Sequence, residues 1–201
     1  MKKLILIGAG GHCKSCIDVI ENENKFKIVA IIDKNKTKKK LLKYKVFEEK
    51  YLNQISPEGY SVIITVGQIK NFKVRERLFN KVKKLGFHLP YIKSPSAYIS
   101  KHSKIGEGTI IMHGAIINAG STIGKNCIIN TNSLIEHDVV IGDHTHVSTS
   151  AIVNGNVLIE KKVFVGSRSV IKNNIKIAQG SIIGASLYIK KNLPENSYIK
   201  K

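Results

Sequence analysis

The sequence predicts two domains in series: a small parallel α/β domain of Rossmann-like character over residues 1–95, and a parallel β-solenoid over residues 96–201. Two patterns predict this division. In the first half, short apolar segments alternate with helical segments around a glycine-rich turn, an order typical of a parallel sheet covered by helices. In the second half, an aliphatic residue returns at every sixth position, and a short fixed period is typical of a solenoid.

The α/β domain is expected to contain three strands and two helices. Each strand is a short apolar run, as in a parallel sheet that is buried on both faces. The turn Gly8-Ala9-Gly10-Gly11 separates the first strand from the first helix, and Gly86 closes the second helix. The expected strands are 2–7, 26–33 and 60–67, and the expected helices are about 14–22 and about 72–85.

The solenoid is predicted by isoleucine or valine at sixteen consecutive positions with a spacing of six, from residue 99 to residue 189. A small residue stands two positions before most of them. Glycine or asparagine often follows directly, and we expect these residues to supply the left-handed backbone of tight corners. They include Gly106, Asn118, Gly124, Asn130, Gly142, Asn154, Gly166 and Gly184. Three six-residue units make one triangular coil of 18 residues, so the segment predicts about five coils.

The charge of the chain limits the classes of partner. It carries 33 basic and 14 acidic residues, a formal net charge of +19, but only three of the basic residues are arginine (Arg75, Arg77 and Arg168). Arginine reads base edges and binds phosphate with two parallel hydrogen bonds, so we do not expect nucleic acid as a partner. The charge favours small anionic ligands that carry phosphate. The KNKTKKK run at 34–40 is expected to be a solvated loop.

The cysteines and the apolar segments of the sequence indicate the cellular compartment of the protein. Three cysteines argue against a disulfide framework, and Cys13 and Cys16 are expected as thiols on the first helix, since only Cys127 remains to complete a zinc site. The apolar run before Gly8 is about five residues, shorter than that of a signal peptide. No apolar run approaches the roughly 20 residues that span a bilayer. We therefore expect a cytoplasmic protein with no membrane partner.

Seven short motifs are spread over the two predicted domains. They are Gly8–His12, Asp33, Thr65-Val66-Gly67, Asn130-Thr131, Ile135-Glu136-His137-Asp138, His146-Val147-Ser148 and Asn154-Gly155-Asn156-Val157. With these motifs the sequence resembles the hexapeptide-repeat sugar acetyltransferases, in particular the sialic-acid O-acetyltransferases and the amino-sugar N-acetyltransferases of the bacillosamine pathway. The resemblance implies a left-handed parallel β-helix, acetyl-CoA as co-substrate, no metal ion, and a homotrimer that acts in bacterial surface-glycan biosynthesis.

His137 is the candidate catalytic residue. Acyl transfer from a thioester needs a base that takes the proton of the acceptor and donors that stabilise the oxyanion. His137 follows the inward-facing Ile135 by two residues, near a corner where a side chain can project outward. Asp138 can fix the tautomer of the imidazole. The resemblance implies that His137 is the general base and that Asp138 tunes it.

The resemblance also distributes the binding residues. It implies that the glycine-rich turn and the ends of the next two strands contact a nucleotide-activated amino sugar, and that the edge of the β-helix between subunits holds the coenzyme. The implied substrate-binding residues are Gly10, Gly11, His12, Asp33, Gly67 and Asn130. The implied coenzyme-binding residues are His146, Gly155, Ser167 and Ala185.

Other functions stay open. The enzyme could acetylate a hydroxyl of sialic acid or a related nonulosonic acid. A carbonic anhydrase of the γ type is built on the same prism with three histidines on zinc, but His113 and His137 are 24 residues apart, which is not a multiple of the 18-residue coil. A non-catalytic scaffold would leave the IEHD motif unexplained. His113 and His144 have no motif of their own and are expected at the surface.

Overall fold

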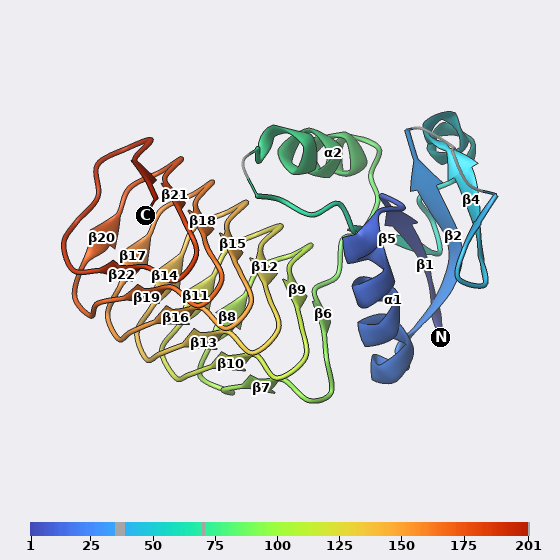
Figure 1. Cartoon of the computed structure of the whole chain (residues 1–201). Helices are drawn as coiled ribbons and strands as arrows, with labels where there is room; N and C mark the ends of the chain where they lie inside the picture. The colour runs from blue at the N-terminus through green and yellow to red at the C-terminus, as the bar shows by residue number, and fades with distance from the viewer. Residues whose placement is uncertain (35–38, 70, 201) are drawn as a thin grey trace.

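The computed structural model describes residues 1–34, 39–69 and 71–200, and it consists of an α/β domain followed by a left-handed parallel β-helix (Figure 1). Both predicted domain types are confirmed. The first β-helix strand, β6 (Ile92–Lys93), begins before residue 96, because it pairs with β9 (Ile110–Ile111). Of the expected loop at 34–40, residues 35–38 lie outside the described residues. No helix among the described residues is long and apolar enough to cross a membrane.

The α/β domain is a five-stranded sheet in the order β3-β4-β2-β1-β5, parallel except for β3. The three predicted strands are confirmed, although β5 ends at Ile64, earlier than expected. The hairpin of β3 and β4 and the 3-10 helix η1 were not predicted, because β3 has only two residues and β4 mixes polar and apolar residues. The elements are β1 (Lys2–Ile7), α1 (Gly11–Glu23), β2 (Phe26–Asp33), β3 (Lys40–Leu41), β4 (Tyr44–Glu48), η1 (Glu49–Gln54), β5 (Tyr60–Ile64) and α2 (Lys73–Lys84).

The central strand β1 is buried on both faces, as its continuous apolar run predicts. On one face Leu4 and Leu6 pack against α1, which lies between this sheet and the first strands of the β-helix (Figure 1). On the other face Ile5 and Ile7 pack against α2. Helix α1 carries Cys13 and Cys16 as buried free thiols, in agreement with the prediction. The two domains therefore share an apolar core around α1.

The β-helix has three faces, which we name after their first strands. The β7 face contains β7 (Tyr98–Ile99), β10 (Ile116–Ile117), β13 (Leu134–Ile135), β16 (Ile152–Val153), β19 (Val170–Ile171) and β22 (Tyr188–Ile189). The β8 face contains β8 (Lys104–Ile105), β11 (Thr122–Ile123), β14 (Val140–Ile141), β17 (Leu158–Ile159) and β20 (Lys176–Ile177). The β6 face contains β6, β9, β12 (Ile128–Ile129), β15 (His146–Val147), β18 (Phe164–Val165), β21 (Ile182–Ile183) and β23 (Tyr198–Ile199).

The predicted coil length is confirmed by the strand register. Ile117 pairs with Ile135, and Ile129 pairs with Val147, 18 residues further on in each case. The aliphatic residue of each unit points inward, and these residues form one continuous core along the β-helix. The last coil is shorter, since Ile183 pairs with Ile199, a separation of 16 residues.

The expectation for the corners was wrong. The left-handed backbone lies three residues after the aliphatic residue, as at Asn126 (φ 52°), Asp138 (φ 60°) and His144 (φ 59°), and not directly after it. The glycines directly after the aliphatic residues are explained by packing between coils. A Cβ on Gly142 would lie 2.5 Å from the backbone nitrogen of Lys161 in the next coil. These glycines let the corners of successive coils stack in close contact.

Candidate functional site

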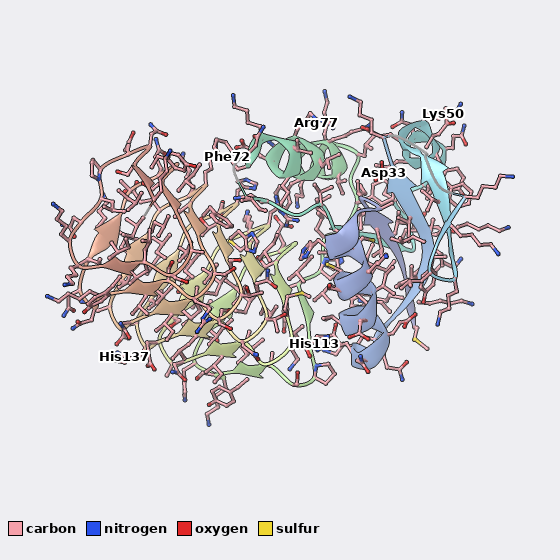
Figure 2. All side chains as sticks on the ribbon, viewed as in Figure 1. Asp33, Lys50, Phe72, Arg77, His113 and His137 are labelled. Carbon is pink, nitrogen blue, oxygen red and sulfur yellow. The ribbon has the colours of Figure 1, made fainter. Side chains whose placement is uncertain are left out.

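His137 lies on the edge of the β-helix that joins the β7 face to the β8 face, which we call the His137 edge (Figure 2). Its side chain is 63% exposed, and Nδ1 lies 2.9 Å from Oδ2 of Asp138. An ionised carboxylate only accepts hydrogen bonds, so Nδ1 donates to it. The lone pair of the neutral imidazole is then on Nε2. Asp138 thus fixes the tautomer that a general base requires.

Two glycines make room for this pair. Gly155 lies one coil after His137, and a Cβ at that position would be 2.6 Å from Nε2 of the imidazole. Gly120 lies one coil before Asp138, and a Cβ there would collide with its carboxylate. Gly155 was expected to contact the coenzyme, which stays a prediction, but within the chain it is in direct contact with the imidazole of His137.

The carboxylate of Glu136 fixes the backbone that carries the His137–Asp138 pair. Its Oε2 accepts hydrogen bonds from Nδ2 of Asn118 at 3.0 Å and from the backbone nitrogen of His137 at 3.3 Å. Two residues of consecutive coils are therefore joined at the corner that carries the imidazole.

The glycine-rich turn lies at the carboxyl ends of the parallel strands. Oδ2 of Asp33, at the end of β2, accepts a hydrogen bond from the backbone nitrogen of Ala9 at 2.7 Å and closes the turn. Beside it is a cavity of about 390 Å³ between the strand ends and α2. Because β2 and β5 flank β1, the cavity is at the point where the strand order reverses, the usual ligand site of such sheets. Its lining includes Gly8, Asp33, Lys34, Val66, Arg77 and Leu78.

His12 lies at the start of α1 and packs against Gly67, where a Cβ would be 3.6 Å from the Cβ of His12. Burial, and after it the charge of the nearby Arg75 guanidinium, lower the pKa of His12 to about 3. Its Nε2 is buried and has no hydrogen-bond partner among the described residues. A neutral imidazole with an unused nitrogen therefore sits beside the turn.

Asn130 and His146 lie at the junction of the two domains. Nδ2 of Asn130 lies 3.0 Å from Nε2 of His146, and Nδ1 of His146 donates to the backbone oxygen of Gln68. His146 is only 6% exposed, and burial lowers its pKa to about 4. Gln68 directly follows Gly67, which packs against His12, so His12 and His146 are both contacted by the Gly67–Gln68 segment. The structure thus brings Asn130 and His146 together with His12 and Gly67.

Ser167 and Ala185 occupy successive coils on the edge between the β6 face and the β7 face, which we call the Asn130 edge because it also contains Asn130. Oγ of Ser167 lies 2.9 Å from Oγ of Ser148 and accepts from Oγ1 of Thr149 at 2.8 Å. His137 is on a different edge, away from the α/β domain (Figure 2). Within one chain, therefore, the candidate base meets Asp138 and Gly155 but not the candidate residues of the α/β domain and the Asn130 edge.

His113 and His144 were both expected at the surface, which is wrong for His144. His144 is only 8% exposed because α2 covers it, with the ring of Phe79 against the imidazole. Its Nδ1 accepts a hydrogen bond from Nδ2 of Asn126 at 2.9 Å. His113 is partly exposed and joins the domains, with Nδ1 2.7 Å from Oγ of Ser94 and Nε2 2.8 Å from Oδ2 of Asp18. No group of three or more His, Cys, Asp or Glu side chains in residues 1–34, 39–69 and 71–200 is arranged to hold a metal ion.

Arg75 and Gln68 are also buried at the junction of the two domains, and neither was predicted from the sequence as a site residue. Arg75 is fully buried on α2. A signal for it exists in the sequence, since it shares the helical spacing of the apolar residues Leu78, Phe79 and Val82, which pack into the core. Gln68 follows Gly67 in the segment after β5 and carries no comparable signal.

The lowered pKa of His146 predicts acid sensitivity. In the unfolded chain the histidine titrates near 6.5, whereas in the folded protein its pKa is about 4. Unfolding therefore takes up a proton below pH 6.5, so stability is present at higher pH and falls as pH drops from about 6.5 towards 4. The melting temperature of the wild-type protein should decline over this range. His146→Asn should reduce the slope of that decline, and an unchanged slope would contradict a buried neutral His146.

Comparisons with known proteins agree with this architecture. Residues 3–82 match the family model of the PglD N-terminal domain, and residues 102–137 match that of the bacterial transferase hexapeptide (six repeats). No match was found among curated proteins.

Among solved structures, the chain is similar to the acetyltransferase domain of PglB from Neisseria gonorrhoeae FA1090, with 26% identity, a TM-score of 0.93, and coverage of 98% of this chain and 96% of that chain. PerB from Caulobacter crescentus, in complex with CoA and GDP-perosamine, is 27% identical with a TM-score of 0.90 and coverage of 98% and 92%. WeeI from Acinetobacter baumannii AYE is 26% identical with a TM-score of 0.87 and coverage of 97% and 94%. The chain therefore carries a PglD-type N-terminal domain followed by bacterial-transferase hexapeptide repeats, and over nearly its whole length it is similar to acetyltransferases solved with CoA or acetyl coenzyme A.

Proposed function

We propose that the protein transfers the acetyl group of acetyl-CoA to the amino group of a nucleotide-activated amino sugar in bacterial surface-glycan biosynthesis. The observation that carries the proposal is the His137–Asp138 pair, which leaves the lone pair of Nε2 available on an exposed edge of the β-helix. PerB, similar over nearly the whole chain, was solved with CoA and GDP-perosamine, and PglB with acetyl coenzyme A. The cytoplasmic location expected from the sequence stays a prediction.

Nε2 of His137 carries out both proton transfers, while Nδ1 stays hydrogen-bonded to Asp138. As the amine of the sugar attacks the thioester carbonyl, Nε2 takes its proton, and the carboxylate of Asp138 stabilises the imidazolium that forms. When the tetrahedral intermediate collapses, the C–S bond breaks and the imidazolium returns the proton to the departing thiolate of CoA. The products are the N-acetylated sugar and free CoA.

The acceptor is proposed to lie at the glycine-rich turn. Gly10 caps α1 and Gly11 is its first residue, so both can present backbone N–H groups to a phosphate at the start of the helix. Both are free of close neighbours, because a Cβ on either would meet nothing within 4 Å. The cavity beside Asp33 offers space for the rest of the nucleotide.

The transfer should be tested directly. The purified protein would be incubated with acetyl-CoA and a panel of UDP- and GDP-linked amino sugars, beside free sialic acids, and the products analysed by mass spectrometry. Acetylation of a nucleotide-linked amine supports the proposal. Acetylation of a sialic-acid hydroxyl would replace it with the O-acetyltransferase alternative.

Gly10→Val tests the place of the acceptor. The backbone at Gly10 has φ −81° and ψ −171°, an extended conformation that valine adopts readily, so folding should be unaffected. The side chain would block close approach of a phosphate, and KM for the sugar should rise with little change for acetyl-CoA in steady-state kinetics. A selective effect on acetyl-CoA would reverse the assignment of the two domains.

A homotrimer is proposed because the candidate residues lie on two edges of one prism. The outward positions of the whole β7 face are apolar, with Tyr98, Ile116 and Tyr188 exposed and Leu134, Ile152 and Val170 partly exposed. An apolar face of this extent is typical of an interface. Packing between copies would bring the His137 edge of one subunit to the Asn130 edge of its neighbour. Sedimentation equilibrium should report a trimer, and a monomer at micromolar concentration would remove this premise.

A further inference from the structure

A continuous path of hydrogen bonds crosses the junction between the α/β domain and the β-helix. It starts at Arg75, whose side chain is fully buried. Its Nη1 donates to the backbone oxygens of Ile64 at 2.8 Å and Val66 at 2.6 Å, at the end of β5. Its Nη2 donates to Asn126 on the β-helix, to the backbone oxygen at 3.2 Å and to Oδ1 at 2.8 Å. One guanidinium thus joins the two domains.

The path continues to Asn130 through two histidines. Nδ2 of Asn126 contacts Nδ1 of His144 at 2.9 Å, and Nε2 of Gln68 donates to the backbone oxygen of His144 at 2.8 Å. The backbone oxygen of Gln68 contacts Nδ1 of His146, and Nε2 of His146 contacts Nδ2 of Asn130 at 3.0 Å. Gln68 is 3% exposed, so its side chain and backbone are both held inside the junction.

The direction of every bond is fixed by chemistry. A guanidinium only donates, so Oδ1 of Asn126 accepts and its Nδ2 donates to Nδ1 of His144. A carbonyl only accepts, so Nδ1 of His146 must donate to Gln68, and its Nε2 accepts from Asn130. Burial lowers the pKa of both histidines, and the charge of Arg75 acts in the same direction on each. The two neutral rings, two residues apart, must therefore hold opposite tautomers.

We infer that Arg75 and Gln68 are positioning residues for the transfer reaction. They hold the Gly67–Gln68 segment against the β-helix and impose the Nδ1–H tautomer on His146, which in turn orients the amide of Asn130. Arginine suits this place because its planar fork reaches acceptors in two domains at once, which the single nitrogen of lysine cannot do. The effect on catalysis rests on the proposed function, whereas the tautomer assignment does not.

The tautomers are measured by NMR on protein labelled with ¹⁵N-histidine at pH 7. The signals of the two rings are assigned from His144→Asn and His146→Asn. We expect His146 to carry its proton on Nδ1 and His144 on Nε2 in the wild-type protein. In Gln68→Met, which loses the bond to His144 but keeps a side chain of similar size, we expect His146 to lose its single tautomer. A wild-type His146 protonated on Nε2 would overturn the inference.

Steady-state kinetics measure the catalytic consequence. Gln68→Met and Arg75→Lys should each lower kcat by roughly 10–10²-fold, the cost of a small misplacement at a reacting centre, while KM for either substrate moves little. Gln179→Met is the matched control, since the amide of Gln179 donates to Glu195 far from the junction. The control should keep the wild-type kcat and the wild-type spectrum of His146.

The NMR tautomer measurement and kcat together distinguish a failure of this inference from a failure of the proposed function. If Arg75→Lys does not fold, Gln68→Met still tests the inference. Folded Gln68→Met protein with a wild-type kcat and a wild-type His146 spectrum would overturn it. If wild-type protein acetylated no nucleotide-linked amine but its two histidines showed the expected tautomers, the proposed function would fail while the assignment of the junction stood.

Discussion

His137→Ala is expected to lower kcat by about 10²–10⁴, the range typical of general-base catalysis. The imidazole acts mainly in the transition state, so KM for acetyl-CoA should hardly change. Folding should be preserved, because His137 is exposed and contributes nothing to the aliphatic core. Asp138→Asn should have a smaller effect on kcat, since it removes the charge but keeps the shape of the side chain. Steady-state kinetics with both substrates varied would measure these losses.

A matched control lies on the same edge of the β-helix. His102 is an exposed histidine in the second coil before His137, and His102→Ala should keep the wild-type kcat. A folded, trimeric His137→Ala protein with near full activity would show that another group is the base. The buried His146 is no ready substitute, because both of its ring nitrogens are already hydrogen-bonded.

The sequence predicted those parts of the fold that repeat or that are uniformly apolar. The hexads predicted the 18-residue register because every inward position obeys one rule, and β1 and β2 were predicted to the residue because each is a mainly apolar run with clear boundaries. The corners were misplaced because two different requirements select glycine. Room for the next coil selects it directly after the aliphatic residue, and the left-handed backbone favours glycine or asparagine two positions later. A single sequence does not separate these two causes.

The candidate site was predictable only in part. The His137–Asp138 pair is local in sequence, and its geometry agrees with the expected role. The burial of His146 depends on the docking of the α/β domain, since its partner Gln68 is 78 residues away in the chain. The same holds for His144, which is covered by α2 and was wrongly expected at the surface. Contacts of this range leave no periodic pattern in the sequence.

Gly155→Ala is expected to impair catalysis without impairing stability. The new Cβ would lie 2.6 Å from Nε2 and 2.7 Å from Cε1 of His137, so the imidazole must leave its place. The ring is 63% exposed and can turn into solvent, so the free energy of unfolding should change by about 1 kcal/mol or less. Displacement of the base should lower kcat by about 10²-fold. Thermal melting and steady-state kinetics on the same preparation would measure both effects.

The matched control is Gly142, where an added Cβ would meet backbone atoms instead of a ring that can turn away. In Gly142→Ala the collision is with the backbone of Lys161 and Glu160, which cannot turn away, so the melting temperature should fall. If Gly155→Ala acts only through His137, it should cause no further loss of kcat in protein that already carries His137→Ala, because the two changes then remove the same interaction. Equal losses from Gly155→Ala in both backgrounds would mean that Gly155 serves another part of the site, with the coenzyme as the next candidate.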